Sequence, residues 1–83
     1  MRYSVTWTRT ATAQLTTLWM RSSNRQGITD AAHRIELELR NDAEKKGIEW
    51  WPFRAYSDDP LAVLFSVHPA DCRVWIVQVR ETA

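Results

Sequence analysis

The chain has 83 residues, which is the length of one domain, and we expect that domain to span residues 1–83. Hydrophobic residues make up 45% of it, and with only two glycines and three prolines this excludes a disordered or loop-rich chain. The net charge of +1 lacks the basic excess usual for a dedicated nucleic-acid binder, and the single cysteine, Cys72, excludes an internal disulfide.

The location of the protein is predicted from two absences. No stretch of the chain approaches the roughly 20 apolar residues that a membrane-spanning helix needs. The first fifteen residues hold no apolar run long enough for a signal peptide. We therefore expect a cytoplasmic protein without a membrane partner.

The first predicted elements are a strand and a helix. Residues 3–8 read YSVTWT, in which apolar and small hydroxyl side chains alternate, and this period of two predicts a half-buried strand. The period then becomes helical, because one stripe of side chains falls at i, i+4, i+7 and i+8. The stripe consists of Ala11, Leu15, Leu18 and Trp19. Either Thr8 or Thr10 is a suitable N-cap, and the polar residues 22–24 end the helix.

A second amphipathic helix follows after a short connection, so the two helices are predicted to form an antiparallel hairpin. Its apolar stripe is Ile28, Ala32, Ile35, Leu39 and Ala43. Thr29 is the expected N-cap, and Gly47 is the expected C-terminal stop. On its polar face three i,i+4 pairs of opposite charge are predicted. They are Arg34 with Glu38, Glu36 with Arg40, and Asp42 with Lys46.

After Gly47 the period of two returns and predicts three strands, over residues 51–56, 61–67 and 73–79. Turns at residues 57–60 and 68–71 are short enough to make an antiparallel meander. The predicted fold class is therefore α+β, in the order β-α-α-β-β-β. In this fold the helix hairpin packs on one face of an antiparallel sheet, and the other face is open for a ligand.

The residues that usually carry chemistry are few. The chain has no glycine-rich phosphate loop, and His33, His68 and Cys72 lack the spacing of metal ligands, so we expect no metal and no cofactor. His68 and Cys72 lie across one turn and raise the alternative of a thiol nucleophile with its base. We interpret them instead as a turn residue and a small residue at a strand start.

The arginines of the strands are the remaining candidates. Arg54 lies between Phe53 and Ala55, whose side chains are expected to enter the core, so Arg54 is predicted to point out of the open face. Arg73 and Arg80 bracket the last strand. Such guanidinium groups either bind an RNA phosphate and stabilise charge during cleavage, or only solubilise an exposed face.

Two adjacent tryptophans, Trp50 and Trp51, stand at the start of the first strand of the meander. Neighbouring strand residues point to opposite faces, so at least one of the two indole rings is expected outside the core. That ring either covers the helix end or is exposed, and an exposed tryptophan beside Arg54 can stack on a base or dock a partner chain.

Four segments together resemble the RelE/ParE toxin superfamily over nearly the whole chain. They are the opening YSVTWTRTATAQLTTLW, the long second helix ending at Gly47, the FR strand, and PLAVLFSVHPADCRVWIVQV. The resemblance implies the toxin of a bacterial type II toxin–antitoxin system, with functions in growth inhibition and plasmid stabilization. It implies a cognate antitoxin that covers the active surface. RelE-like members are metal-independent mRNA interferases on the ribosome, whereas ParE-like members poison DNA gyrase.

The resemblance also implies site residues. Arg54 matches the family's second-strand basic residue, whereas Ala62 stands where the next strand often has an arginine. No tyrosine or histidine follows Arg80, which leaves only Tyr56 and His68 as substitutes for the family's base. The predicted function is a RelE-like toxin, an mRNA interferase with an incomplete catalytic set of Arg54, Arg73 and Arg80. The alternatives are a ParE-like gyrase toxin and a non-catalytic module bound by an antitoxin. The predicted RNA- or partner-binding residues are Trp50, Trp51, Lys45, Lys46 and Tyr56.

Overall fold

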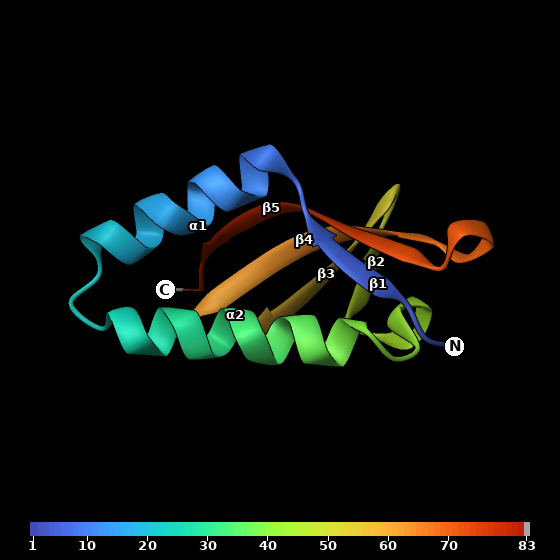
Figure 1. Cartoon of the computed structure of the whole chain (residues 1–83), viewed down its shortest axis with the longest axis horizontal. Helices are drawn as coiled ribbons and strands as arrows, with labels where there is room; N and C mark the ends of the chain where they lie inside the picture. The colour runs from blue at the N-terminus through green and yellow to red at the C-terminus, as the bar shows by residue number, and fades with distance from the viewer. Residues whose placement is uncertain (83) are drawn as a thin grey trace.

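The fold is a five-stranded mixed sheet with two helices packed on one face, as the computed structural model shows for residues 1–82 (Figure 1). Ala83, the last residue of the predicted domain, lies outside the described residues. The elements in chain order are β1 (Ser4–Trp7), α1 (Arg9–Arg21), α2 (Arg25–Leu39), the 3₁₀ turn η1 (Ala43–Lys45), β2 (Ile48–Trp50), β3 (Phe53–Asp58), β4 (Leu61–His68), the 3₁₀ turn η2 (Pro69–Asp71) and β5 (Arg73–Glu81). The strand order is β1-β5-β4-β3-β2, and the predicted α+β class is confirmed.

The sheet differs from the predicted meander in two ways. Residues 48–50 form an additional strand, β2, which pairs antiparallel with β3, so four strands follow the helices and not three. The first strand lies parallel to β5, which makes the sheet mixed and not purely antiparallel. Both differences follow from long-range pairing, which period alone does not encode.

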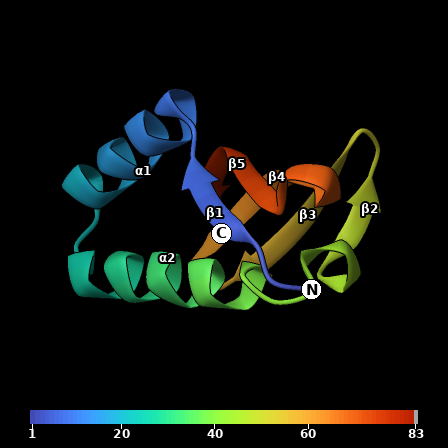
Figure 2. The ribbon, with the colours of Figure 1, turned by 45° about the vertical axis from the view of Figure 1, so that its right-hand side comes forward.

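The two helices lie on the same side of the sheet and diverge from their short connection (Figures 1 and 2). Helix α1 packs along β5, and α2 packs over β3 and β4. The β2–β3 hairpin stands at the opposite end of the molecule from the α1–α2 connection (Figure 2). Neither α1 nor α2 combines the length and the apolar composition of a membrane-spanning helix.

The helix ends confirm one predicted cap and correct two other predictions. Thr8 caps α1, because its Oγ1 accepts a hydrogen bond from the backbone N–H of Ala11 at 3.2 Å. Helix α2 begins earlier than predicted, because the side chain of Asn24, not Thr29, accepts from the N–H of Gly27 at 3.1 Å.

The other correction concerns the C-terminal end of α2, which is at Leu39 and not at Gly47. Asp42 adopts a left-handed conformation with φ of 52°, which stops the helix, and the buried Ala43 belongs to η1. Gly47 has φ of +66°, and a Cβ there would lie 2.0 Å from the carbonyl oxygen of Ala55. Its role is therefore to let the chain pass close to β3 on its way into β2.

The core lies between the helices and the sheet. Phe65, Leu61 and Ile76 from the sheet are fully buried in one cluster with Ile35 and Leu39 of α2. Each such side chain contributes about 1.5–3 kcal/mol by leaving water.

Tyr3 is the polar exception in this core. Its hydroxyl is buried and makes no hydrogen bond among residues 1–82. Burial first, and the nearby Glu44 carboxylate second, raise the pKa of Tyr3 to about 12.

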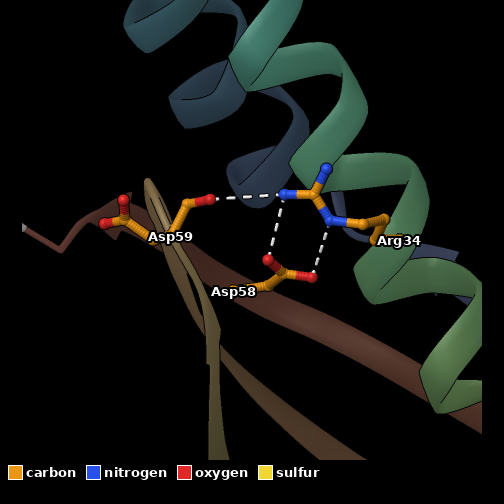
Figure 3. Close-up of polar contacts among 3 residues, drawn as sticks. All are labelled: Arg34, Asp58 and Asp59. Carbon is orange, nitrogen blue, oxygen red and sulfur yellow. Dashed lines mark hydrogen bonds and ion pairs between the residues drawn. The ribbon is translucent and has the colours of Figure 1, made fainter.

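An ion pair fastens α2 to the turn between β3 and β4 (Figure 3). Arg34 donates two hydrogen bonds to the carboxylate of Asp58, at 2.9 and 3.0 Å, and a third to the backbone carbonyl of Asp59 at 3.3 Å. The guanidinium lowers the pKa of Asp58. The pairing of Arg34 with Glu38 was therefore a wrong prediction, since Arg34 reaches across to the sheet.

Of the other two predicted ion pairs, one forms and one does not. Glu36 and Arg40 form their ion pair at 3.0 Å, as predicted. Lys46 does not pair with Asp42 but reaches Glu38 at 2.7 Å, because η1 turns it back over the end of α2.

Candidate binding face of the sheet

The face of the sheet opposite the helices is open, and cross-strand register shows which side chains it carries. Paired residues in a sheet share a face, and successive residues alternate. Phe65, Val63 and Leu61 of β4 point to the helices, so the alternating residues of β4 point the other way. The open face defined in this way carries Ser4, Thr6, Ile48, Trp50, Phe53, Ala55, Ser57, Ala62, Leu64, Ser66, His68, Arg73, Trp75, Gln78 and Arg80.

The open face has no carboxylate among the described strand residues. The acidic residues of the strands are Glu49, Asp58 and Glu81, and register places all three on the helix side. Two guanidinium groups, those of Arg73 and Arg80, remain on the open face with an imidazole. The open face is therefore positive even though the chain is nearly neutral.

One half of the open face is hollowed and apolar. A concavity of about 400 Å³ is lined by Ile48, Trp50, Ala55, Ala62 and Leu64, with Gln78 and Arg80 contributed by β5. We call it the apolar hollow. Ile48 and Trp50 are 66% and 61% exposed, so two large apolar residues of the hollow face solvent.

The other half of the open face is polar and lies at the β4–β5 hairpin. Ser66 Oγ lies 3.0 Å from Nε2 of His68, and Nη1 of Arg73 donates to Oγ1 of Thr6 at 3.3 Å. The guanidinium of Arg73 also lies over the ring of Trp75, 5.5 Å from its centroid. We call Ser66, His68, Arg73, Trp75 and Thr6 the hairpin-end cluster.

Arg54, the best-matched candidate, does not lie on the open face. It pairs with Phe65 across β4 and with Glu49 across β2, so it is on the helix side. Its guanidinium donates to the backbone carbonyl of Lys46 at 2.8 Å and to that of Gly47 at 3.3 Å. The expected orientation was wrong because Phe53 and Ala55, its neighbours, turn out of the core.

The three candidate arginines are not brought together. Arg73 and Arg80 share the open face but lie at opposite ends of β5, roughly 20 Å apart at the rise of a strand. Only Arg80 borders the apolar hollow. The geometry of these three residues therefore does not converge on one phosphate group.

The predicted partner-binding residues do not lie together on one face of the sheet. Trp50 borders the apolar hollow, and Trp51 is 83% exposed in the turn before β3, so neither indole enters the core. Tyr56 is on the helix side, where burial first and Glu38 second raise its pKa. Lys46 lies near it with its pKa raised by its hydrogen bond to Glu38, while Lys45 is exposed on η1.

Neither substitute base reaches the apolar hollow. His68 lies in the hairpin-end cluster, and Tyr56 faces the helices. Among residues 1–82 no group of three or more histidine, cysteine, aspartate or glutamate side chains is placed to hold a metal ion.

Several residues of the open face were missed from the sequence. Ile48 and Leu64 of the apolar hollow, and Ser66 and Thr6 of the hairpin-end cluster, carry no catalytic motif. The alternation of apolar and charged residues in IEW, directly after Gly47, is the one local signal that could have revealed β2.

The similarity of this chain to known proteins is found in its three-dimensional structure and not in its sequence. No protein-family model matches the chain, and no curated protein is significantly similar to it in sequence. A chain of the RelBE2 toxin–antitoxin complex from Mycobacterium tuberculosis superposes with a TM-score of 0.75 at 19% identity, covering 98% of this chain and 99% of that one. A chain of the chromosomal ParDE toxin–antitoxin system from P. aeruginosa gives 0.72 at 19% identity, with 99% and 98% covered. The chain therefore has the fold of RelE/ParE-type toxins.

Proposed function

We propose that this protein is the toxin-type component of a type II toxin–antitoxin pair, and that its antitoxin covers the open face. The structural likeness to chains of two toxin–antitoxin complexes, over almost the full length, supports the first part. The apolar hollow is the single observation that carries the second part.

The chemistry of the open face describes the partner it fits. Trp50 and Ile48 are exposed beside the hollow, and tryptophan is the residue that most often dominates the energy of an interface. Arg80 borders the hollow, and no strand carboxylate is near to neutralise it on this face. An antitoxin segment with a large apolar side chain for the hollow and acidic residues for Arg80 therefore matches this surface.

Expression in bacteria tests this function. We expect induction of the chain alone to arrest growth, and co-expression of the product of the open reading frame adjacent to its gene to restore growth. The two chains should then co-purify. Unimpaired growth on induction, together with an adjacent product that does not bind, would contradict the proposal.

The mode of action is a separate part of the proposal. We infer that the protein acts by binding its target and not by cutting RNA, because Arg54 is engaged by backbone carbonyls and Arg73 lies far from Arg80. DNA gyrase, which the family resemblance implies for ParE-like members, is the target of this first mode. Inhibition of gyrase supercoiling by the purified chain, without new cleavage sites in mRNA, is the expected result.

RelE-like cleavage of mRNA on the ribosome is the second candidate. It is favoured by the positive open face, where Trp50 lies beside Arg80 and could stack on a base. Primer extension on mRNA from a cell-free translation reaction decides between the two. Cleavage that is lost in Arg80→Met and retained in Arg54→Met would establish this second mode in place of the first.

A further inference from the structure

Register orders the hairpin-end cluster, together with the neighbouring Ser4, in two rows across three neighbouring strands. Register places Ser4, Arg73 and His68 side by side in the first row. The second row holds Thr6, Trp75 and Ser66. Strands lie about 4.8 Å apart and same-face residues about 7 Å apart along a strand, so these side chains share a patch of roughly 10 by 7 Å.

Arg73 occupies the centre of this patch without a counter-ion. None of the ion pairs found within residues 1–82 involves Arg73, and Asp71, the nearest acid in sequence, forms none with it. Its guanidinium lies over Trp75 and gives one hydrogen bond to Thr6, so most of its five N–H donors are unused. The guanidinium lies within cation–π range of the indole, and Arg73 is exposed to solvent.

The groups around Arg73 are hydrogen-bond donors in reach of the same ligand. Thr6 lies on its β1 side, and His68 lies on its β4 side with Ser66 held at 3.0 Å from the imidazole. A hydroxyl rotates to donate to an anion, and an imidazole always offers at least one N–H. Guanidinium, imidazole and hydroxyl groups, on a face where the described strand residues carry no carboxylate, form an environment that favours oxyanions over cations.

We propose that the hairpin-end cluster is a binding site for a phosphate group, with Arg73 as its principal ligand and His68, Ser66 and Thr6 at its sides. A phosphate presents several acceptor oxygens, enough for an arginine fork together with flanking hydroxyls, whereas a carboxylate is satisfied by the fork alone. This site lies at the other end of β5 from the apolar hollow, and it does not depend on the proposed toxin function.

Phosphate titration followed by ¹H–¹⁵N NMR tests the site directly. Inorganic phosphate, added at constant ionic strength against chloride, should produce saturable shifts in the amides of Ser66, His68 and Arg73 and in the indole N–H of Trp75. We expect Arg73→Gln to weaken binding by about 10-fold or more, because it removes charge-assisted hydrogen bonds. The same spectra report whether each variant is folded.

Arg80→Gln is the matched control, since it removes the same charge from the same face and strand. It should leave the phosphate affinity unchanged. Shifts that do not saturate, that chloride reproduces, or that persist unchanged in Arg73→Gln would overturn the proposal. An equal loss in Arg80→Gln would also overturn it, because the effect would then be one of net charge.

A second titration identifies the source of the phosphate. A short single-stranded RNA that binds the same residues more tightly than inorganic phosphate, and loses that binding in Arg73→Gln, assigns the site to a phosphodiester backbone. If RNA binding does not depend on Arg73 while phosphate binding does, the site takes a free phosphate or a phosphomonoester. If neither ligand depends on Arg73, the cluster is not a phosphate site.

Discussion

The two faces of the sheet use charged residues in different ways. On the helix side, Arg54 is bound to the backbone carbonyls of Lys46 and Gly47, and Asp58 is bound to Arg34. On the open face, Arg73 and Arg80 have no carboxylate partner among the described residues. Charged groups on the covered face therefore serve the fold, while those on the open face remain available to a ligand.

This difference separates stability from binding. Substitutions on the helix side should lower the free energy of unfolding and leave ligand affinity intact. Substitutions on the open face should do the reverse. Pairs of neighbouring residues on β3, β4 and β5 allow the separation to be tested at nearly constant position.

The largest effect on stability is expected in β4, where Phe65 is fully buried and its neighbour Leu64 faces the apolar hollow. Phe65→Ala should lower the free energy of unfolding by about 3–5 kcal/mol, through lost burial and the cavity left behind. Leu64→Ala should cost less than about 1.5 kcal/mol, because its side chain is only half-buried. Urea denaturation measures both, and equal losses would contradict the assignment of faces.

A smaller effect is expected for the arginines. Arg54→Met keeps the aliphatic length but removes the two hydrogen bonds to backbone carbonyls, and it should lower the free energy of unfolding by about 1–2 kcal/mol. Arg80→Met should change stability by no more than about 0.5 kcal/mol. If Arg80→Met is the less stable of the two variants, then the arginine of the open face stabilises the fold more than Arg54 does, which would contradict this assignment.

The smallest effect concerns pH. Arg34 lowers the pKa of Asp58 below its ordinary value, so the ion pair contributes its full stability above about pH 4 and loses it as pH falls through the folded-state pKa. Thermal unfolding at pH 7 and pH 3 should therefore show a smaller drop in Tm for Asp58→Asn than for the unsubstituted protein. Solvent screens this half-exposed pair, so the difference is small.

Glu49→Gln provides the control for this pH experiment. Glu49 is exposed, and no ion pair involves it within residues 1–82. Its substitution should leave the pH dependence of Tm unchanged. A drop in Tm for Asp58→Asn as large as that of the unsubstituted protein would show that the ion pair contributes nothing to acid sensitivity.

Local patterns were sufficient to predict much of the fold. The alternation in residues 3–8 and the helical stripe from Ala11 to Trp19 both lie within one element, so period alone identified β1 and α1. The cap of α1 at Thr8 is equally local. The same reasoning predicted the helix hairpin and the strands β3, β4 and β5, because each is long enough to show its period.

The predictions that were wrong concern contacts between segments that are distant in the sequence. Arg54 faces the helices because it pairs with Phe65. The apolar character of Phe53 predicted the opposite face, since it does not reveal the register of the strands. Arg34 prefers Asp58, 24 positions away, to the nearer Glu38, because the β3–β4 turn lies beside α2. The apolar hollow forms only when β2 pairs with β3, so the sequence of no single segment predicts it.

Binding of the antitoxin to variants of two exposed aliphatic residues tests the central claim most directly. Ile48 lies on the open face and is 66% exposed, while Leu37 lies on α2 and is 43% exposed. Calorimetry with the product of the adjacent open reading frame should give at least about 30-fold weaker binding for Ile48→Asp, and unchanged binding for Leu37→Asp. Unchanged binding by Ile48→Asp, or a larger loss for Leu37→Asp, would contradict the open face as the antitoxin surface.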